Sequence, residues 1–230
     1  MNLYLSKFLS FFSIKKLLLF ITCVFFTFPL ASCSEKIDYF DSVSELRNNV
    51  FVCETDTFYL RAYALEKEYP YLFDGVANEK TCLTEIFLTA PSGDKECVIS
   101  FTVDGKTYGG EMSYDNVKSE YYYSCSLNVS TLSSLQFTVT YDKTEHLLTA
   151  NSAKKSDTLT PREILQKVFS HNPALFDNLT DKYGFNGEIC IRLLYEEEPY
   201  YYVGVTDRQG KTSAFLLSGK NGKVLASREN

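Results

Sequence analysis

Few side chains of this 230-residue sequence could form a nucleophilic centre. It has two histidines: His146, expected at a strand end or turn, and His171, expected at a helix end, where a basic side chain complements the helix dipole. A reactive thiol needs an exposed, electropositive position. Cys97 and Cys125 instead alternate with apolar residues of extended segments. The pattern predicts a non-enzymatic protein, with a cysteine-nucleophile enzyme as a lesser alternative.

Motifs for metals, nucleotides and serine nucleophiles are missing from the sequence. It contains no HExxH, GxSxG, Walker A or GxGxxG pattern. The acidic run Glu196-Glu197-Glu198 precedes Pro199, and adjacent carboxylates of an extended chain point to opposite faces. We therefore interpret the run as a solvated turn and expect no metal ion and no cofactor.

The N-terminal segment has the organisation of a secretory signal peptide. Lys7, Lys15 and Lys16 precede an apolar run over residues 17–29, and small residues follow in Leu30-Ala31-Ser32-Cys33. The apolar run is shorter than the roughly 20 residues that a membrane-spanning helix needs. We predict a signal peptide over residues 1–32, with an uncleaved anchor as the alternative.

The sequence Leu30-Ala31-Ser32-Cys33 resembles the lipobox of bacterial lipoproteins. The resemblance implies that the thiol of Cys33 receives a diacylglyceryl group and that cleavage makes Cys33 the first residue. Two acyl chains hold a protein stably on a membrane. Ser34 is not the Asp of the inner-membrane retention signal, so the resemblance implies the outer membrane of a Gram-negative cell or the outer face of a Gram-positive plasma membrane.

Charge and cysteine usage limit the partners and the redox chemistry. Removal of the signal peptide would take three lysines and change the formal net charge from −6 to about −9, which speaks against nucleic acid as a partner. Five cysteines would remain between the lipidation site and the C-terminus: Cys53, Cys82, Cys97, Cys125 and Cys190. An odd number and the apolar surroundings favour buried free thiols, with Cys97–Cys125 as the candidate disulfide if one forms.

The fold that must position any site is predicted as β-rich α+β. After a polar tether over residues 33–44, residues 45–150 show extended segments at 50–53, 58–63, 84–88, 121–129 and 135–141, the last with a possible extension at 147–149. A hairpin is expected over residues 97–111, because Asp104-Gly105 separates two alternating runs. This spacing predicts an antiparallel sandwich of immunoglobulin-like type.

A linker over residues 151–160 leads to a second, α+β module over residues 161–230. Thr160, Pro161 and Glu163 form a helix start, and the helix should end near His171, before Pro173. A second short helix is expected over residues 174–183. Four strands then follow at residues 188–195, 200–206, 211–217 and 223–227.

About 30 residues of this module resemble the strand repeat of PepSY-type domains. The matching segments are residues 200–205, the turn at 207–210, and residues 214–217 and 222–225. Such domains are small helix-plus-sheet modules of exported bacterial proteins and peptidase propeptides, with a proposed peptidase-inhibiting role. The helix lacks the small-residue pattern of that family, and no functional residue is carried over.

Two tyrosine triplets, at residues 121–123 and 200–202, could supply contact area for a partner. On a strand the middle tyrosine faces away from its two neighbours. We predict a lipid-anchored, non-catalytic module that binds an envelope protein. The alternative is a cell-wall or polysaccharide-binding module that uses exposed tyrosines.

Overall fold

The computed structural model describes residues 37–69 and 78–229. The predicted signal peptide and Cys33 lie outside the described residues. The described residues from Asp38 onward form one compact unit. None of the helices within the described ranges is both long and apolar enough to cross a membrane.

The described part of the chain is β-rich, as predicted, with 57% of its residues in strands and 11% in helices. A short 3-10 helix, η1 (Tyr39–Ser42), comes first. The first strands are β1 (Val43–Glu54), β2 (Tyr59–Glu68), β3 (Lys80–Thr89), β4 (Cys97–Val103), β5 (Lys106–Glu111), β6 (Ser113–Asp115), β7 (Glu120–Cys125), β8 (Ser134–Tyr141) and β9 (Thr144–Ser152). Then follow α2 (Pro161–His171), α3 (Pro173–Asn178), β10 (Thr180–Asp181), β11 (Gly184–Phe185), β12 (Gly187–Tyr195), β13 (Pro199–Asp207), β14 (Thr212–Ser218) and β15 (Val224–Arg228).

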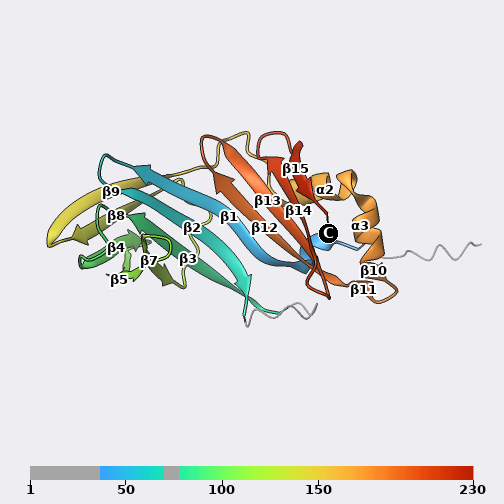
Figure 1. The fold of residues 1–230 in the computed structure, drawn as a ribbon, viewed down its shortest axis with the longest axis horizontal. Helices are drawn as coiled ribbons and strands as arrows, with labels where there is room; N and C mark the ends of the chain where they lie inside the picture. Colours follow the sequence, from blue (N-terminus) through green and yellow to red (C-terminus); the bar gives the residue numbers. More distant parts are fainter. Residues whose placement is uncertain (1–36, 70–77, 230) are drawn as a thin grey trace, which may run out of the picture. The chain divides into compact units, whose positions relative to one another are not determined.

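Strand β1 connects the early and late strands into one sheet (Figure 1). The sheet runs in the order β15-β14-β13-β12-β1-β2-β3-β7-β6. A branch leaves this order at β1: β9 pairs with β1, β8 with β9, β4 with β8, and β5 with β4. Most neighbours are antiparallel, but β1 and β12 pair in parallel. A β-bulge at Asn48 shifts the register between β1 and β2. Such a bulge bends the strand that contains it, here β1.

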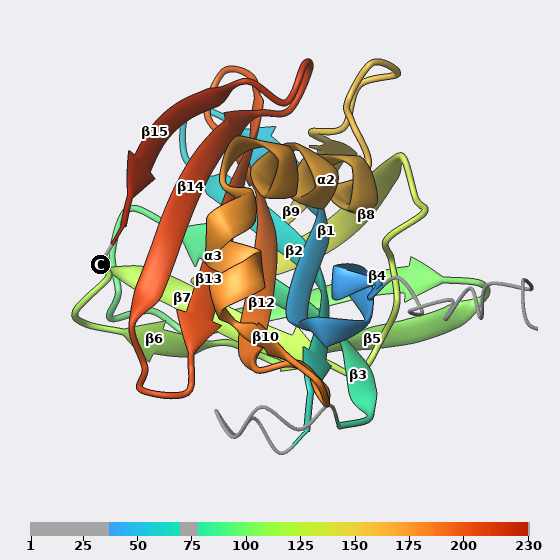
Figure 2. The same ribbon diagram turned by 90° about the vertical axis from the view of Figure 1, so that its right-hand side faces the viewer.

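Two hydrophobic clusters pack on this sheet. The first comes from β1–β9 and contains Phe51, Ile86, Ile99 and Phe137. The second joins Ile164 and Val168 of α2 to Ile191, Tyr201 and Phe215, and Figure 2 shows the two helices over the β12–β14 strands. Since Val43, Leu46 and Val50 of β1 belong to the second cluster and Phe51 to the first, β1 serves both. The boundary predicted at residues 151–160 stays a prediction.

The positions of the turns explain which predicted strand boundaries are confirmed and which are wrong. The hairpin at Asp104-Gly105 is confirmed: both residues have positive φ, and β4 pairs with β5 around them. The segment at 147–149 does not extend the preceding strand, because Asp142 and Lys143 also take positive φ and turn the chain back as β9. The strand predicted over 121–129 ends at Cys125. Beyond it, the Leu127 carbonyl accepts a hydrogen bond from Thr84 Oγ1.

Helix α2 begins and ends as predicted, with a capping box between Thr160 and Glu163. Helix α3 is shorter than predicted and ends at Asn178. Thr180 and Asp181 then pair with Phe185 and Gly184 around a turn, in which Asp181 accepts the N–H of Tyr183 at 2.7 Å.

The last part of the predicted tether is also structured. The 3-10 helix η1 and the start of β1 occupy residues 39–44. The ring of Tyr39 packs against Phe169, Phe176 and Phe185, at centroid distances of 5.4, 4.8 and 5.3 Å. These ring contacts anchor the segment on the second hydrophobic cluster, although Tyr39 itself is only partly buried.

Candidate binding face

The candidate site lies on the sheet face that points away from the first hydrophobic cluster. Along β2, β3 and β7, side chains alternate between that cluster and the opposite face, as the period of a strand requires. The residues Leu60, Ala62, Ile86, Leu88 and Tyr121 are buried in the cluster. Their neighbours, with Arg47 of β1, form a group that we call the outer strip: Arg47, Arg61, Tyr63, Glu85, Phe87, Glu120 and Tyr122.

Three aromatic rings form a row across the outer strip. The rings of Tyr63 and Phe87 lie 5.4 Å apart, and those of Phe87 and Tyr122 lie 5.1 Å apart. The strand register accounts for this row, because Phe87 faces Tyr122 on β7 and Arg61 on β2. Such contacts fix the rings in place and leave a half-buried aromatic surface.

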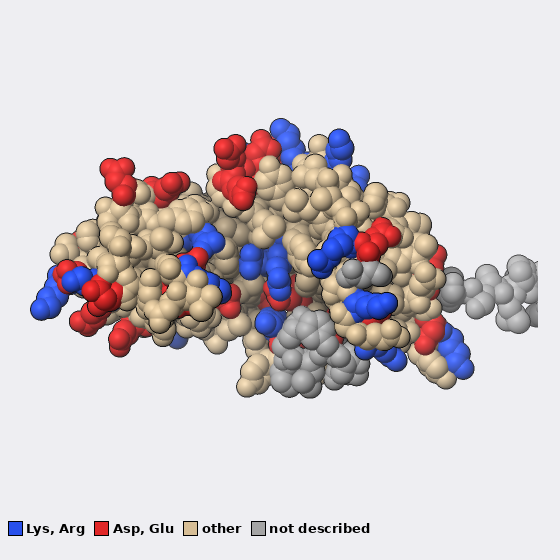
Figure 3. All heavy atoms as spheres, viewed as in Figure 1, with Lys and Arg blue, Asp and Glu red and all other residues tan. Residues whose placement is uncertain are grey.

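Charged groups flank the row of rings. Arg61 donates from Nη2 to Oε1 of Glu120 at 2.6 Å, and the guanidinium of Arg47 lies 3.8 Å from the centre of the Tyr63 ring. The buried Nε of Arg47 has no hydrogen-bond partner among the described residues. Burial lowers the pKa of Arg47, and the nearby Arg192 lowers it further. Figure 3 shows basic side chains gathered in the middle of the drawn face, over the strands labelled β1 and β12 in Figure 1.

A bidentate ion pair fixes the neighbouring β12 strand against β1. Arg192 donates from Nε and Nη2 to the two carboxylate oxygens of Glu45, at 2.6 and 2.9 Å. Burial by itself raises the pKa of Glu45, but the hydrogen bonds and charge of Arg192 outweigh it and lower the pKa below its ordinary value. Glu45 pairs with Arg192, whereas Arg47 has no salt bridge among the described residues and interacts with Glu45 and Glu85 only through their charge.

A groove of about 410 Å³ opens at the β7 end of the outer strip. Its walls are Glu85, Phe87, Ser113, Tyr114, Asp115, Lys118, Glu120 and Tyr122. The Nζ of Lys118 lies 5.7 Å from the centre of the Phe87 ring. Asp115 accepts the backbone N–H groups of Val117 and Lys118, which shapes the turn at the rim, and Val117 is 95% exposed there.

The tyrosine triplets alternate as predicted. Tyr121 and Tyr123 pack on the first cluster while Tyr122 joins the outer strip, and Tyr201 is buried between the half-buried Tyr200 and Tyr202. The buried members are hydrogen-bonded: Tyr201 Oη donates to the Leu159 carbonyl at 2.9 Å. None of the six is fully exposed, so the expected open tyrosine platform is reduced to the half-buried faces of Tyr122, Tyr200 and Tyr202.

The cysteines and histidines do not assemble into a catalytic group within the described ranges. All five described thiols are free, and burial raises the pKa of each; for Cys97 it reaches about 11. The candidate disulfide between Cys97 and Cys125 is therefore not formed. His146 packs 4.8 Å from the Phe58 ring and His171 packs 6.1 Å from Phe215. Residues 37–69 and 78–229 contain no group of His, Cys, Asp and Glu that could hold a metal ion.

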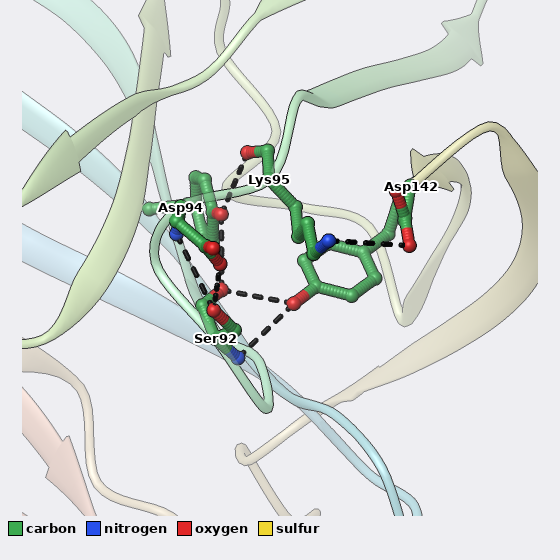
Figure 4. A network of polar contacts seen from close by, with 6 residues as sticks. Ser92, Asp94, Lys95 and Asp142 are labelled. Carbon is green, nitrogen blue, oxygen red and sulfur yellow. Dashed lines mark hydrogen bonds and ion pairs between the residues drawn. The ribbon is translucent and has the colours of Figure 1, made fainter.

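A polar network around Ser92 has a structural explanation (Figure 4). Tyr121 Oη donates to the carbonyls of Ser92 and Lys95, and Tyr141 Oη donates to the Ser92 carbonyl. Ser92 Oγ donates to Asp94, and Lys95 pairs with Asp142 at 3.7 Å. The network anchors a loop to two strands through tyrosine hydroxyls, and the hydroxyl of Ser92 donates to the exposed carboxylate of Asp94, two residues away in the same loop.

Sequence reasoning identified Tyr122 but not the rest of the outer strip. The available signal was the alternation of polar and aromatic residues with apolar ones in Tyr59-Leu60-Arg61-Ala62-Tyr63 and Glu85-Ile86-Phe87-Leu88. What the sequence does not show is the strand order that brings β2, β3 and β7 together. Comparisons with protein-family models, curated proteins and solved structures found no match for this chain.

Proposed function

We propose that the chain is a non-catalytic binding module, held on the extracytoplasmic side of a membrane through lipid on Cys33, and that its outer strip binds an envelope protein. The observation that carries the proposal is the row of Tyr63, Phe87 and Tyr122 flanked by Arg47 and Arg61. Tyrosine, phenylalanine and arginine are the residues enriched in protein interfaces, and aromatic and arginine side chains dominate binding hot spots.

The chemistry of the remaining side chains supports a binding role over catalysis. Thiols with raised pKa values are poor nucleophiles at neutral pH, because the thiolate is the reactive form. The histidine rings pack on aromatic side chains rather than on a nucleophile. A cysteine-nucleophile enzyme is therefore the least supported of the three candidate functions.

The finer fold assignment belongs to the same proposal. We propose that residues 45–150 are an immunoglobulin-like sandwich and residues 161–230 a helix-plus-sheet module. The antiparallel pairing of β2 with β3, β3 with β7 and β4 with β8 supports the first part. The capping box of α2 and the β12–β15 meander support the second part.

Affinity capture from detergent-solubilised native envelope tests the binding function. The bait is the mature chain from Ser34 onward, compared with Phe87→Ser in the outer strip and with Leu147→Ser on β9. Leu147 is 66% exposed and serves as a matched apolar control away from the strip. We expect one near-stoichiometric protein with wild type and Leu147→Ser but not with Phe87→Ser. Equal capture by all three baits would overturn the assignment to the outer strip.

The anchor is tested separately. Cys33→Ala should abolish labelling by a radioactive fatty acid and block cleavage of the signal peptide, because the thiol is the proposed attachment point. Labelling that persists in Cys33→Ala would refute lipidation at this residue and would leave the binding function untouched.

Glycan binding is the second candidate, and the groove favours it by a specific arrangement. Phe87 and Tyr122 line the groove beside the carboxylates of Glu85 and Glu120. Aromatic rings can stack on a sugar, and carboxylates can accept hydrogen bonds from its hydroxyls. Retention of wild type on purified cell-wall polysaccharide, lost in Tyr122→Ser, would favour this function over protein binding.

A further inference from the structure

The groove beside Glu85 holds more acidic than basic groups. Glu85, Asp115 and Glu120 contribute carboxylates and Lys118 the single ammonium among its lining residues. Two of the carboxylates are engaged: Glu120 pairs with Arg61, and Asp115 caps the turn through the N–H groups of Val117 and Lys118. The groove therefore differs from a surface on which charges are paired throughout.

Glu85 is the groove carboxylate that neither forms a salt bridge nor caps a turn among the described residues, although its charge acts on Arg47. It is half-buried, it forms no ion pair with any described residue, and its hydrogen-bond contact is with Tyr122 Oη at 3.4 Å. That distance is at the long end for a hydrogen bond from a hydroxyl. A half-buried carboxylate gains from an added cation partner, because the surrounding protein screens the attraction less than water does.

The aromatic wall of the groove is suited to the same cation. A positive charge over the face of an aromatic ring is attracted by the ring's quadrupole. The chain's own Lys118 already lies over Phe87, with its ammonium 5.7 Å from the ring centre, so this wall of the groove accommodates a cation. The exposed Val117 at the rim adds an apolar contact for the residues that flank such a cation in a peptide.

We infer that this groove binds a lysine or arginine side chain of the protein partner, with Glu85 as its counter-ion and Phe87 and Tyr122 as its aromatic walls. The inference rests on the proposed function and names the chemistry that the binding face recognises. Lys118 then acts as a competitor, because the incoming cation must displace its ammonium from the position over Phe87. Charge complementarity agrees with this, since the mature chain would carry a net charge of about −9.

Fluorescence polarisation with a labelled Gly-Lys-Gly-Lys-Gly peptide tests the inference on the mature chain, residues 34–230. We expect Glu85→Gln to weaken binding about fivefold or more and Lys118→Gln to strengthen it about two- to fivefold, since loss of a rim charge changes electrostatic attraction by such factors. The control variant Glu145→Gln removes an exposed carboxylate of β9 and should leave the affinity unchanged. Acetylation of both peptide lysines should remove the binding.

Unchanged affinity in both groove variants, weaker binding by Lys118→Gln, or equal binding of the acetylated peptide would each overturn the inference. Thermal unfolding of each variant shows that it is folded, and Lys118→Gln changes an exposed side chain, so its result does not depend on the stability of Glu85→Gln. If the peptide does not bind while Phe87→Ser still abolishes partner capture, the inferred basic ligand is wrong but the proposed binding function is retained.

Discussion

Arg192 and Glu45 join two strands that are 147 residues apart in the sequence, through two hydrogen bonds of 2.6 and 2.9 Å. The pair bridges β12 and β1. Glu45 lies two residues before Arg47 on β1, and Arg47 lies opposite Arg192 in the parallel register. Glu45 accepts both hydrogen bonds from Arg192, and the guanidinium of the neighbouring Arg47 lies on the Tyr63 ring. The ion pair thus links the parallel strand pairing to the chemistry of the outer strip.

Loss of this pair should destabilise the fold. The Glu45 side chain is only 7% exposed, so Arg192→Met leaves a buried carboxylate without its partner. We expect the free energy of unfolding to fall by about 3 kcal/mol, measured by urea denaturation at pH 7. Arg162→Met is the matched control. It breaks an exposed pair with Asp38 and should cost less than about 1 kcal/mol. Equal losses in the two variants would contradict the special role of Glu45.

Acid should weaken the fold partly through the same carboxylate. The pKa of Glu45 in the folded chain lies below its ordinary value of 4.5, so the folded state binds the proton less readily than the unfolded state. Its stabilising contribution is complete above pH 4.5 and is lost as the pH falls toward the lowered folded pKa. In Glu45→Gln, unfolding curves from pH 7 to pH 3 should therefore show a smaller acid-dependent loss than wild type. An identical pH dependence would rule out the effect.

Two glycines of the β4–β5 hairpin should respond very differently to alanine. A Cβ on Gly109 would lie 2.2 Å from the Ile99 backbone oxygen, and its φ is +149°. Gly105 also has positive φ, but its Cβ would meet open space. We expect Gly109→Ala to cost about 3 kcal/mol or more of unfolding free energy and Gly105→Ala about 1 kcal/mol. Similar losses of unfolding free energy in the two variants would contradict the prediction, because they would mean that β5 moves away from Ile99 at little cost.

The thiols should be slow to react in the folded protein. Burial raises the pKa of all five, with Cys97 at about 11, so little thiolate exists at pH 7.4. Iodoacetamide labelling followed by mass spectrometry should show slow modification of native protein and fast modification of all five thiols in urea. One thiol that reacts in the native state at the rate of a free low-pKa cysteine would revive the nucleophile hypothesis.

Local signals in the sequence predicted local structure well. Asp104-Gly105 marked a hairpin, and Thr160 with Glu163 marked a helix start, because each depends on residues a few positions apart. The turn at Asp142-Lys143 escaped prediction since neither residue is the glycine that positive φ usually favours. The parallel pairing of Val43 with Ile189 depends on contacts across the chain, which no local pattern encodes. The candidate face follows the same division: a tyrosine triplet indicated Tyr122, but its neighbours Phe87 and Tyr63 come from two other strands.

The central claim is that the outer strip contacts a protein partner at the envelope, and site-specific photo-crosslinking in intact cells tests it most directly. A benzophenone amino acid replaces Tyr122 in the groove or, as control, Leu147 on β9. We predict one dominant protein adduct from position 122 and none from position 147. Absence of an adduct at 122, or the same adduct at both positions, would contradict the account.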